Sequence, residues 1–397
     1  MKSFCMGLIA AAVLQSSAPA VDLAISVEPT TSPAGASSAE PQVTVDRGRA
    51  ILSWVELAGK HTTLRFADAT AAGWSAARTA ASGDEFMINS SDVPSVRRLA
   101  DNRLVAQWLQ AEGPDPEAYT LQLSWSRDDG RTWSAPLTPH HDHVQTQHGF
   151  ASLFQVPGSG LGLVWLDGRA ISPEAAEGSG NMALRAATFD PAGKQLNEKV
   201  VDARVCECCP TAAAATKDEV IVAYRNRSTA EIRDVYVTRL VNGRWTPPVA
   251  VHHDGWKING CPINGPAISA RDRDVAVAWF TANGGTGHAF VAFSRDGGRA
   301  FAAPIRVDDS SSVGHLGIEW FDDHSAAVTW VESLDQRSSF MVRRVDTSGR
   351  RGLAVRIGDS SGTRYPRIAR SGGDLVFAWT ETENGTSRVR TARGAVR

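Results

Sequence analysis

Four of the five cysteines of this chain lie in two short segments, and three of these four are crowded together. Cys206, Cys208 and Cys209 lie in RVCECCP, and Cys261 lies in NGCPING. Thiols at such spacing form disulfides, bind a soft metal ion such as Cu(I) or Zn(II), or take part in thiol–disulfide exchange. The compartment of the protein, and the elements that bring the two segments together, decide between these chemistries.

The first residues indicate export. The segment MKSFCMGLIAAAVLQSSAPA has Lys2 ahead of an apolar run and ends in Ala18-Pro19-Ala20. This order of charged, apolar and small residues is typical of a secretory signal peptide, and we expect cleavage after Ala20. An uncleaved N-terminal anchor is the alternative, although the apolar run is too short to span a membrane. The protein is therefore expected to be secreted or periplasmic, without a membrane span.

Export and composition narrow the classes of function. Removal of residues 1–20 leaves four cysteines, and an even number in an exported protein favours disulfides. The net charge of −2 gives no reason to expect nucleic acid or an anionic membrane surface as a partner.

A sevenfold repeat supplies the elements that position these residues. Seven short apolar runs, rich in β-branched residues, contain an aromatic residue at intervals of roughly 50 residues. These aromatic residues are Trp54, Trp108, Trp165, Tyr224, Trp279, Trp330 and Trp379. A strand precedes each run, and two further strands joined by a tight turn follow it. Four strands repeated at this period predict an all-β fold, a β-propeller of seven four-stranded blades.

The two ends of the chain are expected to close this ring. The seventh unit has three strands before Arg397, while residues 21–27 form a free strand ahead of the first unit. That N-terminal strand would complete the last blade and remove the exposed sheet edges. Residues 28–41, rich in Pro, Ser and Ala, would link it to the first blade, so that residues 21–397 form a single domain. A six-bladed ring with a degenerate terminal unit is the alternative.

Most polar residues of interest gather on one face of such a ring. The loop leading into the first strand of each blade (the leading loop) and the loop between its second and third strands emerge on the same face, near the central channel. The leading loops carry the four cysteines and two histidine-rich segments, 140–148 and 252–256. The arginine and tyrosine residues of interest on this loop-rich face are Arg169, Arg225, Arg227, Arg233, Arg364 and Tyr365.

A second polar set lies two positions beyond the core aromatic residues. Its members are Glu56, Gln110, Asp167, Asn226, Thr281, Glu332 and Glu381. We expect them to ring the channel mouth on the loop-rich face, where carboxylates could act as general acid or base. Hydrogen bonding to neighbouring loop amides is the alternative role.

The repeat also places the cysteines side by side. Cys206, Cys208 and Cys209 lead into the fourth blade and Cys261 into the fifth, so a disulfide from Cys261 to one of the three is expected. The second bridge would then be local: Cys206–Cys208, Cys206–Cys209 or the vicinal Cys208–Cys209. The alternative is a Cu or Zn site formed by the four cysteines with His252 and His253. Disulfides without a cofactor are the favoured interpretation.

Two hairpin turns point to a family. The turn SRDDGRTW (126–133) joins the third and fourth strands of the second unit, and SRDGGRAF (294–301) is a weaker copy. Asp128 and Asp296 are interpreted as turn residues that accept main-chain N–H bonds. The pattern S-x-D-x-G-x-T-W is the Asp box, or BNR repeat, and the chain resembles the sialidase (neuraminidase) superfamily of β-propellers over nearly all of residues 21–397.

The resemblance implies an exo-sialidase type of glycoside hydrolase site. That family binds the substrate carboxylate with three arginines and uses a Tyr–Glu nucleophile pair and an acidic Asp. The segment RYPRIARSGGDLVFAWTE resembles the last-blade pattern, with Tyr365 as nucleophile and Glu381 as the group that orients an arginine. The first family arginine, however, is replaced by Asp92 in SDVPSV, and a carboxylate there would repel an anionic substrate.

Two functional hypotheses follow. The first is an exported sialidase-like propeller that binds, and as an enzyme would hydrolyse, a glycan or other anionic ligand on the loop-rich face. Its candidate catalytic residues are Tyr365, Asp167, Glu332 and Glu381. Its candidate ligand-binding residues are Arg225, Arg227, Arg233, Arg364 and Arg169, because guanidinium groups pair with carboxylates in a bidentate manner. The second is a non-catalytic propeller that binds a ligand or another protein.

Overall fold

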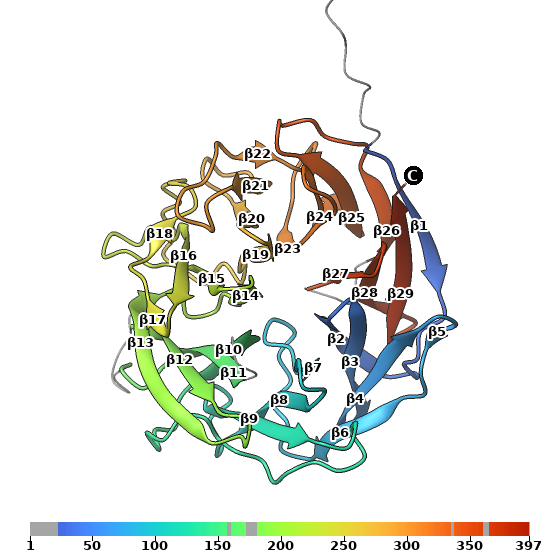
Figure 1. Ribbon diagram of the computed structural model, residues 1–397, viewed down its shortest axis with the longest axis vertical. Coiled ribbons are helices and arrows are strands. Elements are labelled where there is room, and N and C mark those ends of the chain that lie inside the picture. The colour runs from blue at the N-terminus through green and yellow to red at the C-terminus, as the bar shows by residue number, and fades with distance from the viewer. Residues whose placement is uncertain (1–22, 157–159, 172–180, 335–336, 360–364, 397) are drawn as a thin grey trace, which may run out of the picture.

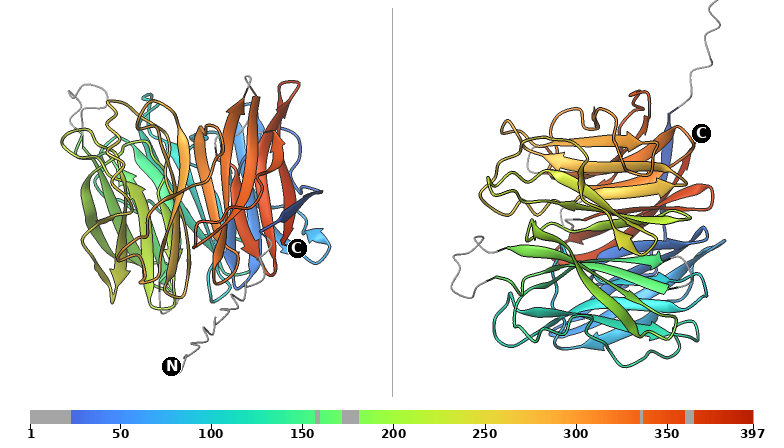
Figure 2. Two further views of the ribbon diagram at one scale, coloured as in Figure 1. Left: turned by 90° about the horizontal axis from the view of Figure 1, so that it is seen from above. Right: turned by 60° about the vertical axis from the view of Figure 1, so that its left-hand side comes forward.

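A computed structural model shows seven β-sheets arranged as blades around a central axis (Figure 1). It describes residues 23–156, 160–171, 181–334, 337–359 and 365–396. Seen from the side, the strands run between two loop-bearing faces of a disc (Figure 2). The predicted all-β, seven-bladed propeller is therefore confirmed, and the six-bladed alternative is wrong.

The first three blades follow one another along the chain. Blade 1 contains β2 (Ser38–Asp46), β3 (Arg49–Ala58), β4 (His61–Thr70), β5 (Gly73–Trp74) and β6 (Arg78–Gly83). Blade 2 contains β7 (Ser95–Arg98), β8 (Leu104–Ala111) and β9 (Tyr119–Ser126). Blade 3 contains β10 (His148–Val156), β11 (Gly160–Asp167), β12 (Met182–Phe189) and β13 (Gln195–Val205). Blade 2 departs from the expected four strands, because a single bridge between Leu123 and Leu137 stands in place of the fourth.

Blades 4 to 6 continue the ring. Blade 4 contains β14 (Ala212–Ala215), β15 (Glu219–Arg225), β16 (Val235–Val241), β17 (Arg244–Trp245) and β18 (Val249–Ala250). Blade 5 contains β19 (Ala267–Arg271), β20 (Asp274–Thr281), β21 (His288–Ser294) and β22 (Ile305–Arg306). Blade 6 contains β23 (Gly314–Trp320), β24 (Ser325–Leu334), β25 (Arg337–Asp346) and β26 (Val355–Asp359).

Blade 7 joins the two ends of the chain. It contains β27 (Arg367–Ser371), β28 (Asp374–Glu383), β29 (Thr386–Val396) and, as its outer strand, β1 (Ile25–Thr30). The antiparallel register runs from Ile25 opposite Val396 to Thr30 opposite Thr391, and Figure 1 shows β1 beside the C-terminal strand. The predicted closure by an N-terminal strand is confirmed. The connection to blade 1 is residues 31–37, because both flanking strands extend into the predicted linker 28–41.

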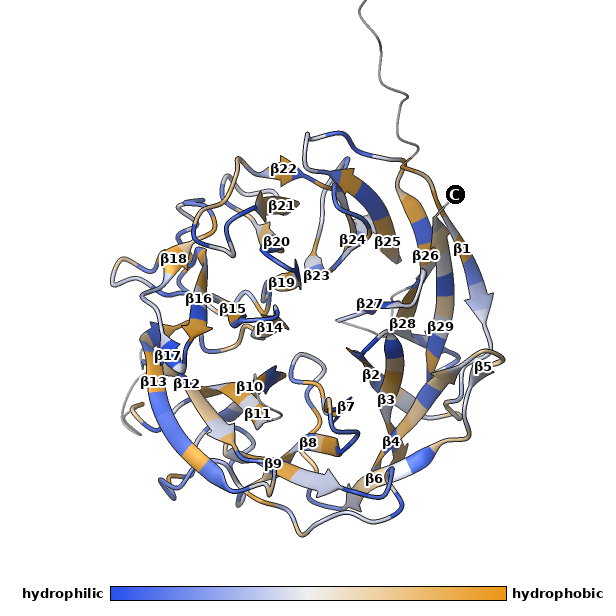
Figure 3. Ribbon diagram, in the orientation of Figure 1, coloured by the Kyte–Doolittle hydropathy of each residue, from blue (hydrophilic) through white to orange (hydrophobic). Residues whose placement is uncertain are grey.

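The core lies between the blades. Trp54, Trp165, Trp279 and Trp330, each on the second strand of its blade, are essentially fully buried. The apolar clusters join neighbouring blades: Trp279 of blade 5, for example, packs with Ile221 of blade 4. Hydrophilic stretches lie on outer strands such as β13 (Figure 3). Burial between sheets explains why the second strands are continuous apolar runs rather than alternating ones.

Hydrogen bonds within the turn at 126–133 stabilise it. Asp128 accepts the main-chain N–H groups of Arg131 and Thr132 at 3.1 and 2.9 Å. A hydrogen bond from the Thr132 hydroxyl has the largest effect on the pKa of Asp128, and together with the main-chain bonds it lowers this pKa to about 2. Gly130 has φ 83° and lies against Phe66, so a Cβ there would be both strained and in collision.

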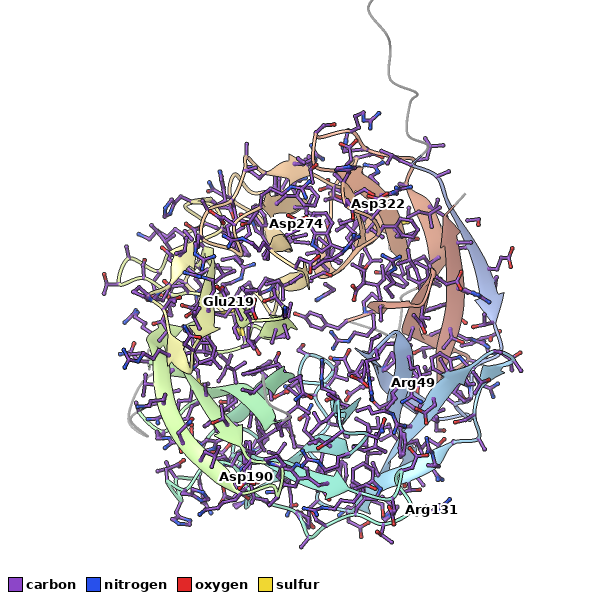
Figure 4. The ribbon with its side chains drawn as sticks, in the orientation of Figure 1. Arg49, Arg131, Asp190, Glu219, Asp274 and Asp322 are labelled. Carbon is purple, nitrogen blue, oxygen red and sulfur yellow. A yellow bond between two sulfur atoms is a disulfide. The ribbon has the colours of Figure 1, made fainter. Side chains whose placement is uncertain are left out.

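Neighbouring blades are also joined by Glu219, labelled in Figure 4, which pairs with Arg239 of its own blade and Arg299 of blade 5.

Residues 1–20, the predicted signal peptide, lie outside the described part of the chain. Within that part, the structure has no helix whose length and apolar character would let it cross a membrane.

Candidate functional site

The first strands of all seven blades surround a central cavity of about 200 Å³. Its polar lining comes mainly from Gln42, Thr44, Ser95, Arg97, Ser152, Thr211, Glu319, Tyr365 and Arg367. Figure 4 shows side chains from several blades reaching toward this axis. The short inner strands place these side chains there, because alternate residues of a strand point to opposite faces.

Two arginines and one carboxyl group give the cavity its charge. Arg97 of β7 and Arg367 of β27 keep some accessible surface, which faces the cavity, but protein surrounds both. This burial lowers the pKa of Arg97 and lowers that of Arg367 to about 10. Burial raises the pKa of Glu319 to about 7, although Ser269 donates a hydrogen bond to it at 3.0 Å. Positive charge therefore exceeds negative charge in the cavity, and the excess grows as Glu319 is protonated.

Tyr365 lies at the loop-rich end of the cavity and is 4% exposed. Its hydroxyl donates to the carbonyl of Ile263 at 2.6 Å and accepts from the amide of Gly265 at 3.3 Å. The ring of His315 contacts its edge, with the two centroids 4.6 Å apart. The phenolic proton is thus directed at a main-chain carbonyl, an arrangement that links blade 7 to the leading loop of blade 5.

Two carboxyl groups are buried beside the inner strands of blades 1 and 2: Glu40 lies in β2, and Asp92 precedes β7. Burial, followed by the charge of Asp92, raises the pKa of Glu40 to about 8, and Oε2 of Glu40 has no hydrogen-bond partner. Burial likewise raises the pKa of Asp92 to about 7. Asp92 accepts the amide N–H of Phe150, and a side chain in place of Gly149 would collide with it. The position that resembles the first family arginine therefore anchors blade 2 to blade 3.

Arg225 is 1% exposed and is saturated by main-chain acceptors. It donates to the carbonyls of Asn264, Arg233 and Phe280 at 2.9, 2.6 and 2.8 Å. Burial lowers the pKa of Arg225 to about 10, and its guanidinium lies 5.1 Å from the ring centre of Trp256. These contacts hold blades 4 and 5 together and direct the guanidinium away from any ligand.

Arg227 and Arg233 are also buried, and both pair with glutamates in the loops of blade 4. Arg227 donates to both carboxylate oxygens of Glu231, at 2.9 and 3.1 Å. Arg233 donates to Glu207 at 2.7 and 3.2 Å. The arginine cluster is therefore an internal ion-pair network, and the structure does not bring it to the cavity. Arg364, the fourth candidate of this set, lies outside the described residues.

The carboxylates beyond the core tryptophans are held by neighbouring side chains. Glu56 accepts from the indole of Trp54 at 3.1 Å and from Arg65 at 3.0 Å. Glu381 accepts from Arg390 at 2.7 Å. Glu332 differs, because burial and the charges of Asp308 and Asp309 raise its pKa.

Asp167 and Arg169 bind each other. Arg169 donates to both oxygens of Asp167 at 2.7 Å, and Trp165 donates to Asp167 at 2.8 Å. These partners, despite the opposing effect of burial, lower the pKa of Asp167. An ionised, fully bonded carboxylate cannot donate the proton that a general acid must supply.

The four cysteines pair as Cys206–Cys209 and Cys208–Cys261, with Cα–Cα distances of 5.7 and 6.0 Å. Cys206 also contacts Arg233, whose Nη1 lies 3.4 Å from its sulfur. His252 pairs with Asp254 at 2.8 Å, and the exposed His253 lies 4.0 Å from Asp234. Among the described residues, the cysteine group that could hold a metal ion includes neither of these histidines.

Tyr365 is the one residue of the polar lining given above that was a sequence-based candidate, and Arg97 and Arg367 are the two arginines that were not. Both are on inner strands, in PSVRRL and YPRIA, where alternation already indicates which side chains face the axis. The alternation of side chains can be read from the sequence, but it identifies residues that face the axis only once the innermost strand of each blade is known.

No protein-family profile and no curated protein matches the sequence. Solved structures do match in fold. The phage phi92 endosialidase has a TM-score of 0.52 and 9% identity over 94% of this chain and 70% of its own. The polysaccharide lyase Uly1 has a TM-score of 0.51 and 8% identity over 89% and 88%. A variant of the NanB sialidase from Streptococcus pneumoniae has a TM-score of 0.50 and 10% identity over 87% and 83%. The fold thus resembles that of propellers named for action on glycans.

Proposed function

We propose that this protein is an exported glycan-binding propeller that holds an acidic group of its ligand in the central cavity, between Arg97 and Arg367. The excess of positive charge in that cavity is the observation that carries the proposal. Guanidinium groups suit carboxylates and sulfates, and a buried site strengthens such pairing. The fold similarity to two sialidases and a polysaccharide lyase supports a glycan as the ligand class.

The size of the cavity limits what enters it. Its volume of about 200 Å³ is below the range of roughly 300–1,000 Å³ that is usual for pockets which enclose a whole small ligand. We infer that one acidic sugar residue inserts its charged end, while the rest of the glycan lies across the loop-rich face.

Binding is better supported than hydrolysis through a tyrosine nucleophile. A phenol needs a base to become nucleophilic, and the hydroxyl proton of Tyr365 is directed at the Ile263 carbonyl. The main-chain bonds of Arg225 and the ion pairs of Arg227 and Arg233 leave no clamp of the sialidase type among the described residues. Tyr365 is therefore proposed to shape the mouth of the cavity.

Binding of acidic oligosaccharides by the purified chain tests the proposal. Sialyl and uronyl oligosaccharides are titrated by calorimetry against wild type, Arg97→Gln and Arg367→Gln. Loss of a charged hydrogen bond costs about 1.5–3 kcal/mol, so each variant should bind at least about tenfold more weakly. The matched control is Arg244→Gln, an exposed arginine of the outer strand β17, which should bind as wild type does. Equal affinity of all four proteins, or no binding of any acidic glycan, would overturn the proposal.

A further inference from the structure

Two histidines and an aspartate converge in the loop that leads into blade 3. One nitrogen of each ring and one oxygen of Asp142 lie within 4.8 Å of one another, and His140 and His148 are at least nine-tenths buried. Nδ1 of His140 and Nε2 of His148 are each 3.3 Å from Oδ2 of Asp142. His140 and Asp142 lie in this loop and His148 begins β10, so the loop must fold back on the strand to bring the three together.

Three ring nitrogens of this cluster have no hydrogen-bond partner among the described residues. Nδ1 of His148 faces the carbonyl of Thr146 at 3.2 Å, and a carbonyl only accepts, so this nitrogen carries the proton. In the neutral ring, Nε2 then presents a lone pair toward the carboxylate. Within the described residues, no hydrogen bond reaches Nε2 of His148 or either nitrogen of His140. Buried polar atoms without partners are costly, so such convergence calls for a cation.

We propose that His140, Asp142 and His148 form a binding site for a divalent transition-metal ion such as Zn²⁺. Two imidazoles and a carboxylate are a common ligand set for such ions, and open positions complete the coordination. The bond from His148 to the Thr146 carbonyl is the contact that typically fixes the tautomer of a ligating histidine. Oδ1 of Asp142 accepts the amide of Val144 at 2.9 Å, which leaves Oδ2 directed at the histidines.

The charges around the site favour a cation. Among the described residues, Asp142, Asp167 and Glu198 pair with two guanidinium groups, those of Arg169 and Arg185. Nη2 of Arg169 lies 2.9 Å from Oδ2 of Asp142 and also pairs with Asp167 and Glu198. If a metal ion binds Oδ2 of Asp142, Arg169 therefore keeps Asp167 and Glu198 as partners.

The rings must separate when the metal binds. They are stacked, with centroids 3.6 Å apart and planes 4° apart, whereas lone pairs lie in the ring planes. His148 belongs to β10, while His140 lies in the loop outside any strand, so His140 is the ring that turns.

The test measures zinc binding by the chelator-treated full chain. Calorimetric titration with Zn²⁺ should show one equivalent for wild type and at least about tenfold weaker binding for Asp142→Asn and His140→Gln. The matched control, His253→Gln, changes an exposed histidine outside this cluster and should bind as wild type does. Absence of zinc binding by wild type, undiminished binding by both site variants, or loss in the control would each overturn the proposal.

A second measurement does not depend on variants that fold. The electron paramagnetic resonance spectrum of the wild-type chain with one equivalent of Cu²⁺ should show coupling to imidazole nitrogen. Coupling to two nitrogens supports the site, whereas a spectrum without nitrogen coupling, or one dominated by thiolate, contradicts it. Glycan binding plays no part in either readout, so this proposal and the proposed function can fail separately.

Discussion

Trp165 donates its indole N–H to Asp167, two residues further along the same strand, at 2.8 Å. Trp54 and Glu56 repeat the relationship in blade 1 at 3.1 Å. An arginine of the third strand stands opposite the tryptophan in both blades, since Arg65 pairs with Trp54 and Arg185 with Trp165 in the sheet register. The polar residue two positions beyond a core tryptophan is therefore part of the packing between strands in these blades.

Asp167→Ala should destabilise the fold strongly, because it leaves Arg169 and the Trp165 indole without their buried acceptor. Removal of one member of a buried ion pair costs about 3–5 kcal/mol in the free energy of unfolding. The control is Glu381→Ala, whose pair with Arg390 is partly exposed and worth about 0–1 kcal/mol. Urea denaturation measures both, and equal losses would contradict the assignment.

Arg225→Met should lower stability rather than ligand affinity. The change leaves three main-chain carbonyls without a donor, and each buried unsatisfied group costs about 1–3 kcal/mol. Thermal unfolding measures the loss, and glycan titration of the folded fraction should match wild type. Arg97→Gln should do the reverse, losing affinity while its melting temperature changes little. If Arg225→Met kept its stability and lost affinity, Arg225 would belong to the binding site.

The disulfide pairing has a direct chemical test. Mass spectrometry of non-reduced peptides should recover Cys206 linked to Cys209 and Cys208 linked to Cys261. Cys261→Ser should cost about 2–5 kcal/mol in the free energy of unfolding, because it opens the bridge between two leading loops. Recovery of a vicinal Cys208–Cys209 bond, or of four free thiols in the native protein, would refute this pairing.

Glu40 should make stability depend on pH. Its folded pKa of about 8 exceeds the ordinary value of 4.5, so the folded state binds the proton more tightly than the unfolded state does. The free energy of unfolding should therefore fall as pH rises through this interval and level off above it. Glu40→Gln should flatten the decline, whereas the exposed Glu383→Gln should leave it unchanged. Denaturation midpoints from pH 4 to about 9 measure the slope, and an equal slope in all three proteins would show that Glu40 is not responsible.

Much of the fold could be predicted because the repeat is local. Each core aromatic residue lies in a run that a single strand buries, and the 50-residue period counts the blades. The departures occur where short-range signals are weak. Blade 2 has one bridge in place of a fourth strand, and β1 and β2 both extend into a segment that composition marked as linker.

For the candidate site, the sequence predicted only that the residues of interest lie on the loop-rich face. Arg225, Arg227 and Arg233 are correctly grouped by their spacing, but their spacing cannot show that Glu207, Glu231 and main-chain carbonyls already satisfy them. Arg97 faces the cavity because its strand is the innermost of its blade, and only the closed ring shows this.

By itself, the sequence determined the strand periodicity and the number of blades, because both follow from apolar runs of residues that are near one another in the chain. It also indicated how the ring closes, because the last unit lacks one strand and a free strand precedes the first unit. Only the tertiary structure decided which polar groups are already bonded and which face the axis. Hydrogen bonds such as Tyr365 to Ile263, or Asp92 to Phe150, join residues from different blades. Their partners are set by the geometry of the closed ring, which no local pattern contains.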